Sequence, residues 1–207
     1  MNRAIVQFTA NLESAKHLGI IFEAFSDKVT EAIQLDELLR AEIVFGVSAL
    51  DCYIHDVVRI GMKKLLTSVD EPNGFQNFGV SMHFVKGLLQ ASNPQDRLTL
   101  FDQEVRRLHG FKSFQKAENI SQGFALIGVR RLWDKAAVEF GIPAADVKTK
   151  LNLIVDRRNK IAHEGDIDPT LGVGNKYPID LAMVSNAIDF IGELVAVIHK
   201  IVNSEIP

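Results

Sequence analysis

The sequence predicts an all-α fold, an up-and-down helical bundle with extra short helices inserted between its second and penultimate helices. Apolar residues recur at helical spacing along nearly the whole chain, whereas alternating period-two strands are hard to find. Residues typical of helix starts and stops punctuate this pattern. The length of 207 residues suits a single domain that spans residues 1–207.

The helical pattern divides into segments separated by breaker residues. We expect helices near residues 9–25, 31–66, 80–90, 94–109, 120–140, 143–164 and 179–204. The first of these belongs to an N-terminal helical segment over residues 1–30. Residues 67–79 are rich in Ser, Asp, Pro, Asn and Gly and therefore predict a loop. A second loop is expected over residues 166–178, before the last helix.

Several helix ends carry specific signals. Asn93 is the expected cap of the helix that follows it, with Pro94 at its first position. Gly141 and Gly165 are typical of residues that end a helix, and Pro143 opens the helix between them.

Two of the expected helices are strongly apolar. The long early helix carries a wide stripe at helical spacing, formed by Leu35, Leu38, Leu39, Ile43, Phe45, Val47, Leu50, Ile54, Val57 and Val58. The last helix carries Leu181, Val184, Ile188, Ile191, Leu194, Val195, Ile198 and Ile201. A helix this apolar packs centrally or forms a subunit interface.

Composition and net charge limit the functions that this chain can have. Hydrophobic residues make up 47% and charged residues 24%, which is an ordinary globular balance. The formal net charge of −3 argues against broad nucleic-acid affinity, so any RNA contact must be local. Basic residues cluster at 106–107, 130–131 and 157–160. We interpret the first two clusters as solvated helix faces, and the third as a candidate site.

Cysteine usage and hydropathy point to a cytoplasmic protein. Cys52 is the single cysteine, so no internal disulfide can form, and its apolar neighbours predict that it is buried. We expect no signal peptide, because no basic stretch leads into a long apolar run. We also expect no membrane span, since no window approaches roughly 18 uninterrupted apolar residues.

The segment of residues 151–165 contains the main candidates for functional residues. On an ideal helix, Val147, Leu151, Ile154, Val155, Ile161 and Ala162 form one apolar face. Arg158 falls in the middle of that face. Burying a guanidinium there costs free energy unless a carboxylate or a phosphate pairs with it. Arginine does not lose its proton in proteins, so the charge remains.

A polar stripe borders this apolar face. Asn152, Asp156, Asn159 and His163 are spaced four, three and four residues apart, so they share one side of the helix. Asp156 or Asn159 could therefore orient His163 and fix which ring nitrogen carries its proton. In the simpler structural interpretation, Arg158 only ties helices together and His163 caps carbonyl groups.

Arg158 and His163 do not point the same way. They are five residues apart, which is roughly 140° around an ideal helix. A bent helix end could bring them together in one subunit. A symmetric dimer does so more naturally, by placing two copies of this helix across a two-fold axis and making the site composite.

Residues 158–163, Arg-Asn-Lys-Ile-Ala-His, resemble the Arg-x4-His signature of the HEPN superfamily. The longer segment of residues 157–166 is similar to the RiboL-PSP-HEPN branch, and so are residues 45–56, Phe-Gly-Val-Ser-Ala-Leu-Asp-Cys-Tyr-Ile-His-Asp. The resemblance spans about residues 35–203. It implies a helical bundle that forms a homodimer, and an endoribonuclease that needs no metal and no cofactor.

The resemblance also implies roles for individual residues. Arg158 would hold the scissile phosphate, and His163 would act as general base or acid on the ribose 2′-OH or the leaving oxygen. Asn159 would position His163 or the phosphate, and Asp51 is the candidate acidic partner of Arg158. Asp156, Arg157 and Glu164 are the supporting residues of the motif. The products would be a 2′,3′-cyclic phosphate and a 5′-OH.

The residues agree with this chemistry, because RNA carries its own nucleophile. No metal-binding constellation is evident, since the six His residues are scattered, and no Gly-rich phosphate loop points to ATP.

The biological role that the resemblance implies is that of a toxin or phage-defence effector, with an antitoxin or other protein partner. Some HEPN toxins carry a modifiable Tyr two residues after the His, but that position is Gly165 here, which argues against such regulation. The alternative is a noncatalytic HEPN dimer that binds RNA or a protein.

Overall fold

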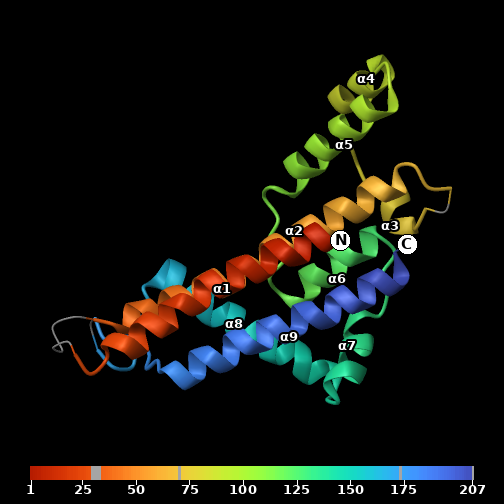
Figure 1. Ribbon diagram of the computed structural model, residues 1–207. Helices are drawn as coiled ribbons and strands as arrows, with labels where there is room; N and C mark the ends of the chain where they lie inside the picture. Colours follow the sequence, from red (N-terminus) through yellow and green to blue (C-terminus); the bar gives the residue numbers. More distant parts are fainter. Residues whose placement is uncertain (29–33, 70, 173, 207) are drawn as a thin grey trace.

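The structure is a computed structural model that describes residues 1–28, 34–69, 71–172 and 174–206, and it confirms the all-α prediction. The regular elements of these residues are helices, with no β-strand among them (Figure 1). They are α1 (Asn2–Phe25), α2 (Asp36–Leu65), α3 (Asn73–Gln76), α4 (Met82–Gln90), α5 (Pro94–His109), α6 (Ala117–Leu126), α7 (Leu132–Phe140), α8 (Ala144–Glu164) and α9 (Leu181–Glu205).

Helix α2 is the central element of the bundle. It packs against α1, α8 and α9, and also against α5 and α6 (Figure 1). Most of its predicted stripe is buried, including Leu39, Leu50 and Ile54, which are fully enclosed. Leu35 and Leu38 at its start are half-buried, and Phe45 is 53% exposed. Cys52 is also exposed, so the expectation that it is a buried hydrophobe is wrong.

Helix α9 packs centrally against α1, α2 and α7, as its apolar sequence predicts. Ile188, Ile191 and Ile198 are almost completely buried. Gly46 of α2 permits the close approach, because a Cβ there would lie 2.3 Å from the Cδ1 atom of Ile188. By length and composition, α9 could also cross a membrane, with a mean hydropathy of 1.8. The core helix of a water-soluble protein can have the same length and hydropathy, so these two properties are weak evidence for a membrane span.

Three segments differ from the sequence prediction. The helix expected over residues 120–140 is divided into α6 and α7, because the chain turns at Gly128 and Arg131, whose φ angles are +83° and +55°. The loop expected over residues 67–79 contains the short helix α3. The first helix begins at Asn2 rather than near residue 9. The expected start of the second helix lies at residues outside the described part of the chain.

The predicted caps are confirmed. The Asn93 side chain accepts a hydrogen bond from the backbone N–H of Asp96 at 2.8 Å, with Pro94 beginning α5. Gly141 and Gly165 follow the ends of α7 and α8 in the left-handed conformation that glycine adopts without strain. Helices α4 and α5 form a hairpin whose α4 end projects from the bundle, while α5 also packs against α2 (Figure 1).

Candidate active site

The site residues predicted from sequence lie mostly on α8, whose apolar face is buried only along part of its length. Val147, Leu151 and Val155 are buried, as predicted. In the last turns Ile161 is only half-buried and Ala162 is exposed. The apolar face therefore ends before the Arg-x4-His motif is complete, and the motif lies where α8 meets the surface.

Arg158 is half-buried rather than enclosed in the apolar face, which corrects the prediction from helical periodicity. Its Nη1 donates a hydrogen bond to Asn159 Oδ1 at 3.1 Å, and its Nε is buried without a hydrogen-bond partner. Among the described residues it forms no ion pair. Asn159 is thus placed to fix the guanidinium, a contact that the sequence interpretation did not include.

The guanidinium lines a cavity of about 460 Å³ between α2, α5 and α8. Two other arginines also line it, Arg59 on α2 and Arg106 on α5. Both of these are ion-paired with Asp102, and Arg59 also with Asp56 at 2.9 Å. Arg158 is therefore the cavity arginine whose charge no described carboxylate neutralises.

Asp51 lines the same cavity, but its hydrogen bonds are to residues other than Arg158. Its carboxylate accepts hydrogen bonds from the backbone N–H of Phe114 at 2.6 Å and from Gln115 Nε2 at 3.0 Å. These bonds hold the segment between α5 and α6 against α2. Asp51 forms no ion pair with Arg158 here, so the expected acidic partnership is wrong for this conformation.

The polar stripe of α8 has two different environments. Asn152 Oδ1 accepts a hydrogen bond from the backbone N–H of Ala117 at 3.1 Å, and Asp156 pairs with Lys116 at 2.8 Å. Both contacts anchor the start of α6. Asp156 therefore holds Lys116 rather than orienting His163.

His163 and Glu164 occupy the last turn of α8. Both side chains are exposed, and neither has a hydrogen-bond or ion-pair partner in the part of the chain that the structure describes. His163 is not among the residues that line the Arg158 cavity. One subunit therefore does not bring the guanidinium and this imidazole into a common cavity.

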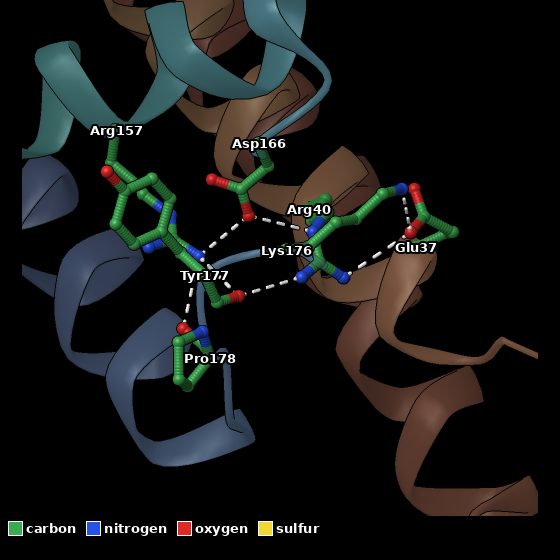
Figure 2. A network of polar contacts seen from close by, with 7 residues as sticks. All are labelled: Glu37, Arg40, Arg157, Asp166, Lys176, Tyr177 and Pro178. Atoms are coloured by element: carbon green, nitrogen blue, oxygen red, sulfur yellow. Dashed lines mark hydrogen bonds and ion pairs between the residues drawn. The ribbon is translucent and has the colours of Figure 1, made fainter. Parts of the chain in front are cut away.

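Arg157, next to Arg158, forms a buried ion pair of the kind that the sequence predicted for its neighbour (Figure 2). Its Nη2 donates to Asp166 Oδ2 at 2.7 Å and to the carbonyl oxygen of Tyr177 at 3.2 Å. Arg40 of α2 donates to the same Asp166 oxygen through Nε at 2.8 Å and to the Tyr177 carbonyl oxygen at 2.9 Å. Asp166 is fully buried, and Arg40 is 5% exposed.

This network fastens the segment that follows α8. Asp166 has a φ of +60°, which turns the chain back directly after Gly165. The N–H of Tyr177 donates to the backbone oxygen of Asp166, and Ile167 forms a β-bridge with Lys176. The Tyr177 ring lies against Lys160, whose Nζ is 4.3 Å from the ring centroid. The network therefore fixes the end of α8 beside α2.

Two histidines that the sequence interpretation did not include line the Arg158 cavity. His55 and His109 have ring centroids 6.4 Å apart. Burial, with smaller effects of Lys112 and His55, lowers the pKa of His109 to about 4, so this ring is neutral at pH 7. The distance of His55 from Arg158 in the sequence concealed their proximity.

Among the described residues, no three His, Cys, Asp or Glu side chains lie close enough together to hold a metal ion. The sequence model of the family described as RiboL-PSP-HEPN matches residues 10–204. The chain belongs to the RiboL-PSP-HEPN family. No curated protein and no solved structure matches this HEPN chain.

Family membership confirms the resemblance and extends it over α1, which the sequence interpretation left outside. It indicates a ribonuclease-type or RNA-related function for the HEPN chain. In this RiboL-PSP-HEPN protein the Arg-x4-His motif is carried by the last two turns of α8, with Arg158 at a cavity and His163 on the surface.

Proposed function

We propose that this protein is a metal-independent endoribonuclease that cleaves RNA through the ribose 2′-OH, leaving a 2′,3′-cyclic phosphate and a 5′-OH. The observation that carries the proposal is the guanidinium of Arg158, half-buried at a cavity and without a carboxylate partner among the described residues. A partly desolvated cation without a counter-ion favours an anionic ligand, and a phosphodiester supplies one.

The roles follow from position. Arg158, held by Asn159, binds the phosphate and stabilises the charge that develops on its oxygens. His163 is exposed and without a partner in the described chain, so its ring nitrogens are free to take the proton of the 2′-OH. RNA supplies the nucleophile, which leaves proton transfer and charge stabilisation to the protein.

The active form in this proposal is a homodimer with composite sites. His163 does not line the Arg158 cavity of its own subunit. A two-fold axis near the end of α8 would bring the imidazole of one copy to the guanidinium of the other. RNA and a second copy of the chain are thus the proposed partners.

The biological role that we propose is that of a cytoplasmic toxin or phage-defence effector, held in check by an antitoxin or another protein. Uncontrolled cleavage of RNA would harm the host cell, which gives such a partner its purpose. Expression of the parent protein alone should therefore slow growth, and expression of His163→Ala should not.

The direct test is RNA cleavage by purified protein in EDTA. The parent should cleave, and His163→Ala and Arg158→Ala should each lose at least about 100-fold in rate, because each removes a proton-transfer or charge-stabilising group. His17→Ala, which changes an exposed histidine of α1, is the matched control and should cleave like the parent. Equal cleavage by His163→Ala would remove that residue from the mechanism.

The separation of Arg158 from His163 within one subunit favours a second candidate, a noncatalytic HEPN module that binds RNA. In that case RNA binding depends on Arg158 alone. Binding that is lost in Arg158→Ala and retained in His163→Ala, with no cleavage by the parent, would select this function over the nuclease.

A further inference from the structure

A second imidazole, that of His55, lines the same cavity as Arg158 within one subunit. His55 lies on α2, and its side chain is 28% exposed. Its ring packs against Phe114 with a centroid separation of 4.6 Å. The ring is therefore held in place at the cavity while remaining accessible to a ligand.

The contacts of His55 determine which nitrogen is available. Nε2 lies 3.2 Å from the carbonyl oxygen of Lys112, to which it donates its proton. Nδ1 has no hydrogen-bond partner among the residues that the structure describes. Because one imidazole nitrogen is engaged with the protein, Nδ1 is the nitrogen left for substrate.

Asp51 lies beside the engaged nitrogen of this ring. Its Oδ1 lies 3.7 Å from Nε2 of His55, one helical turn away on α2. The hydrogen bonds from Phe114 and Gln115 fix the carboxylate in that position. A carboxylate and a carbonyl beside Nε2 hold the ring in one orientation, as the acid of a hydrolytic triad orients its histidine.

Cleavage through the 2′-OH requires two proton transfers. The 2′-oxygen attacks phosphorus and gives its proton to a base, while the bond from phosphorus to the 5′-oxygen breaks and that oxygen gains a proton from an acid. In the proposed function His163 is the base. The acid must then be a second group within reach of the phosphate that Arg158 holds.

We propose that His55 is the general acid of this reaction, donating its Nδ1 proton to the departing 5′-oxygen, and that Asp51 is the residue that positions it. This inference rests on the proposed ribonuclease function. The observation that carries it is the placement of His55, Asp51 and Arg158 around one cavity. Asp51 thereby serves the site through His55 and not through Arg158.

A substrate whose leaving group needs no proton tests the assignment. One RNA oligonucleotide carries an ordinary phosphodiester at the cleavage position, and a matched one carries a 5′-bridging sulfur, which leaves as a thiolate. His55→Ala should cleave the ordinary RNA about 100-fold more slowly than the parent and the sulfur-bridged RNA at nearly the parental rate. His163→Ala should be slow on both.

His55→Gln is the second variant, because its side-chain amide can still donate to the Lys112 carbonyl but has no proton to transfer. It should behave as His55→Ala does, and it keeps the test available if that variant folds poorly. His83→Ala, at an exposed histidine of α4 that does not line the cavity, should cleave both RNAs like the parent. Asp51→Asn should show the His55→Ala pattern in weaker form.

The outcomes separate this inference from the function on which it rests. An active parent whose His55 variants cleave ordinary RNA at the parental rate overturns the inference alone. Equal slowing of the His55 variants on both RNAs overturns it too, because that pattern indicates a structural role. An inactive parent overturns the ribonuclease proposal together with this one.

Discussion

Arg157 and Asp166 form an ion pair of 2.7 Å, and Arg40 binds the same carboxylate oxygen of Asp166 (Figure 2). The guanidinium of Arg157 is therefore ion-paired, whereas that of the adjacent Arg158 has no ion-pair partner in the described chain. The two adjacent arginines of α8 therefore have opposite roles. Arg157 joins α8 to α2 and to the segment that follows Gly165. Arg158 faces a cavity without a carboxylate partner among the described residues, which makes it the arginine available to a phosphate.

The network predicts a large loss of stability when its shared acid is neutralised. Asp166→Asn keeps the shape of the side chain and tolerates the positive φ, but it removes the buried carboxylate that Arg40 and Arg157 share. Arg157 then has no ion-pair partner in the described chain, and Arg40 retains only its contact with Glu37 at 3.4 Å. The free energy of unfolding should fall by about 3 kcal/mol or more, measured by urea denaturation. Asp134→Asn, which breaks the exposed pair with Arg131, should cost less than about 1 kcal/mol. A loss at Asp166 no greater than at Asp134 would show that the network does not hold the fold.

The two neighbouring arginines should separate stability from activity. Arg157→Ala removes a buried ion pair and should lower the melting temperature markedly. Arg158→Ala removes no ion pair that the structure describes, so its melting temperature should stay close to that of the parent while RNA cleavage is lost. Thermal denaturation and cleavage of the same preparations give both readouts. A strongly destabilised Arg158→Ala would instead support the structural interpretation of that residue.

A composite site predicts recovery of activity on mixing inactive subunits. Arg158→Ala and His163→Ala should each be inactive. When the two are unfolded together and refolded, heterodimers would carry one site with both residues intact. Random pairing makes about half of the dimers mixed, so about a quarter of the parental sites should return. Recovery that fails to exceed the sum of the separate variants would argue that Arg158 and His163 act within one subunit.

Buried Glu42 predicts a pH dependence of stability that is unrelated to catalysis. Burial raises its pKa to about 7, opposed by nearby Lys16 and reinforced by Asp189. The folded protein then holds a proton that the unfolded chain has lost above its ordinary pKa of 4.5. Stability should therefore decline as the pH rises from about 4.5 to 7. Glu42→Gln should be more stable than the parent at pH 8 in urea denaturation, and this advantage should shrink towards pH 5. A constant difference between the two proteins across this range would contradict the assignment.

Local sequence signals predicted the fold well where the determining contacts are themselves local. Asn93 caps α5 and Gly165 ends α8 through hydrogen bonds and backbone angles that neighbouring residues determine. The break between α6 and α7 was missed because one glycine within an apolar pattern is usually tolerated in a helix. The left-handed conformation of Arg131, on which the turn depends, has no comparable sequence signal.

The candidate site was predicted in its chemistry and only partly in its geometry. Helical periodicity placed Arg158 at the centre of an apolar face, but the acid that attracts a guanidinium is Asp166, beyond the helix end. Its turn back towards α2 brings it to Arg157, a tertiary contact that periodicity on α8 does not contain. His55 meets Arg158 only through the packing of α2 against α8, so no spacing in the sequence connects them.

The chemistry of the cleaved ends tests the central claim most directly. RNA incubated with the purified parent protein in EDTA is analysed by mass spectrometry of the fragments. Fragments that end in a 2′,3′-cyclic phosphate and begin with a 5′-OH, and that are absent with Arg158→Ala, are the predicted result. Intact RNA, or fragments that carry a 3′-OH and a 5′-phosphate, would contradict an attack by the ribose 2′-oxygen at the Arg158 site.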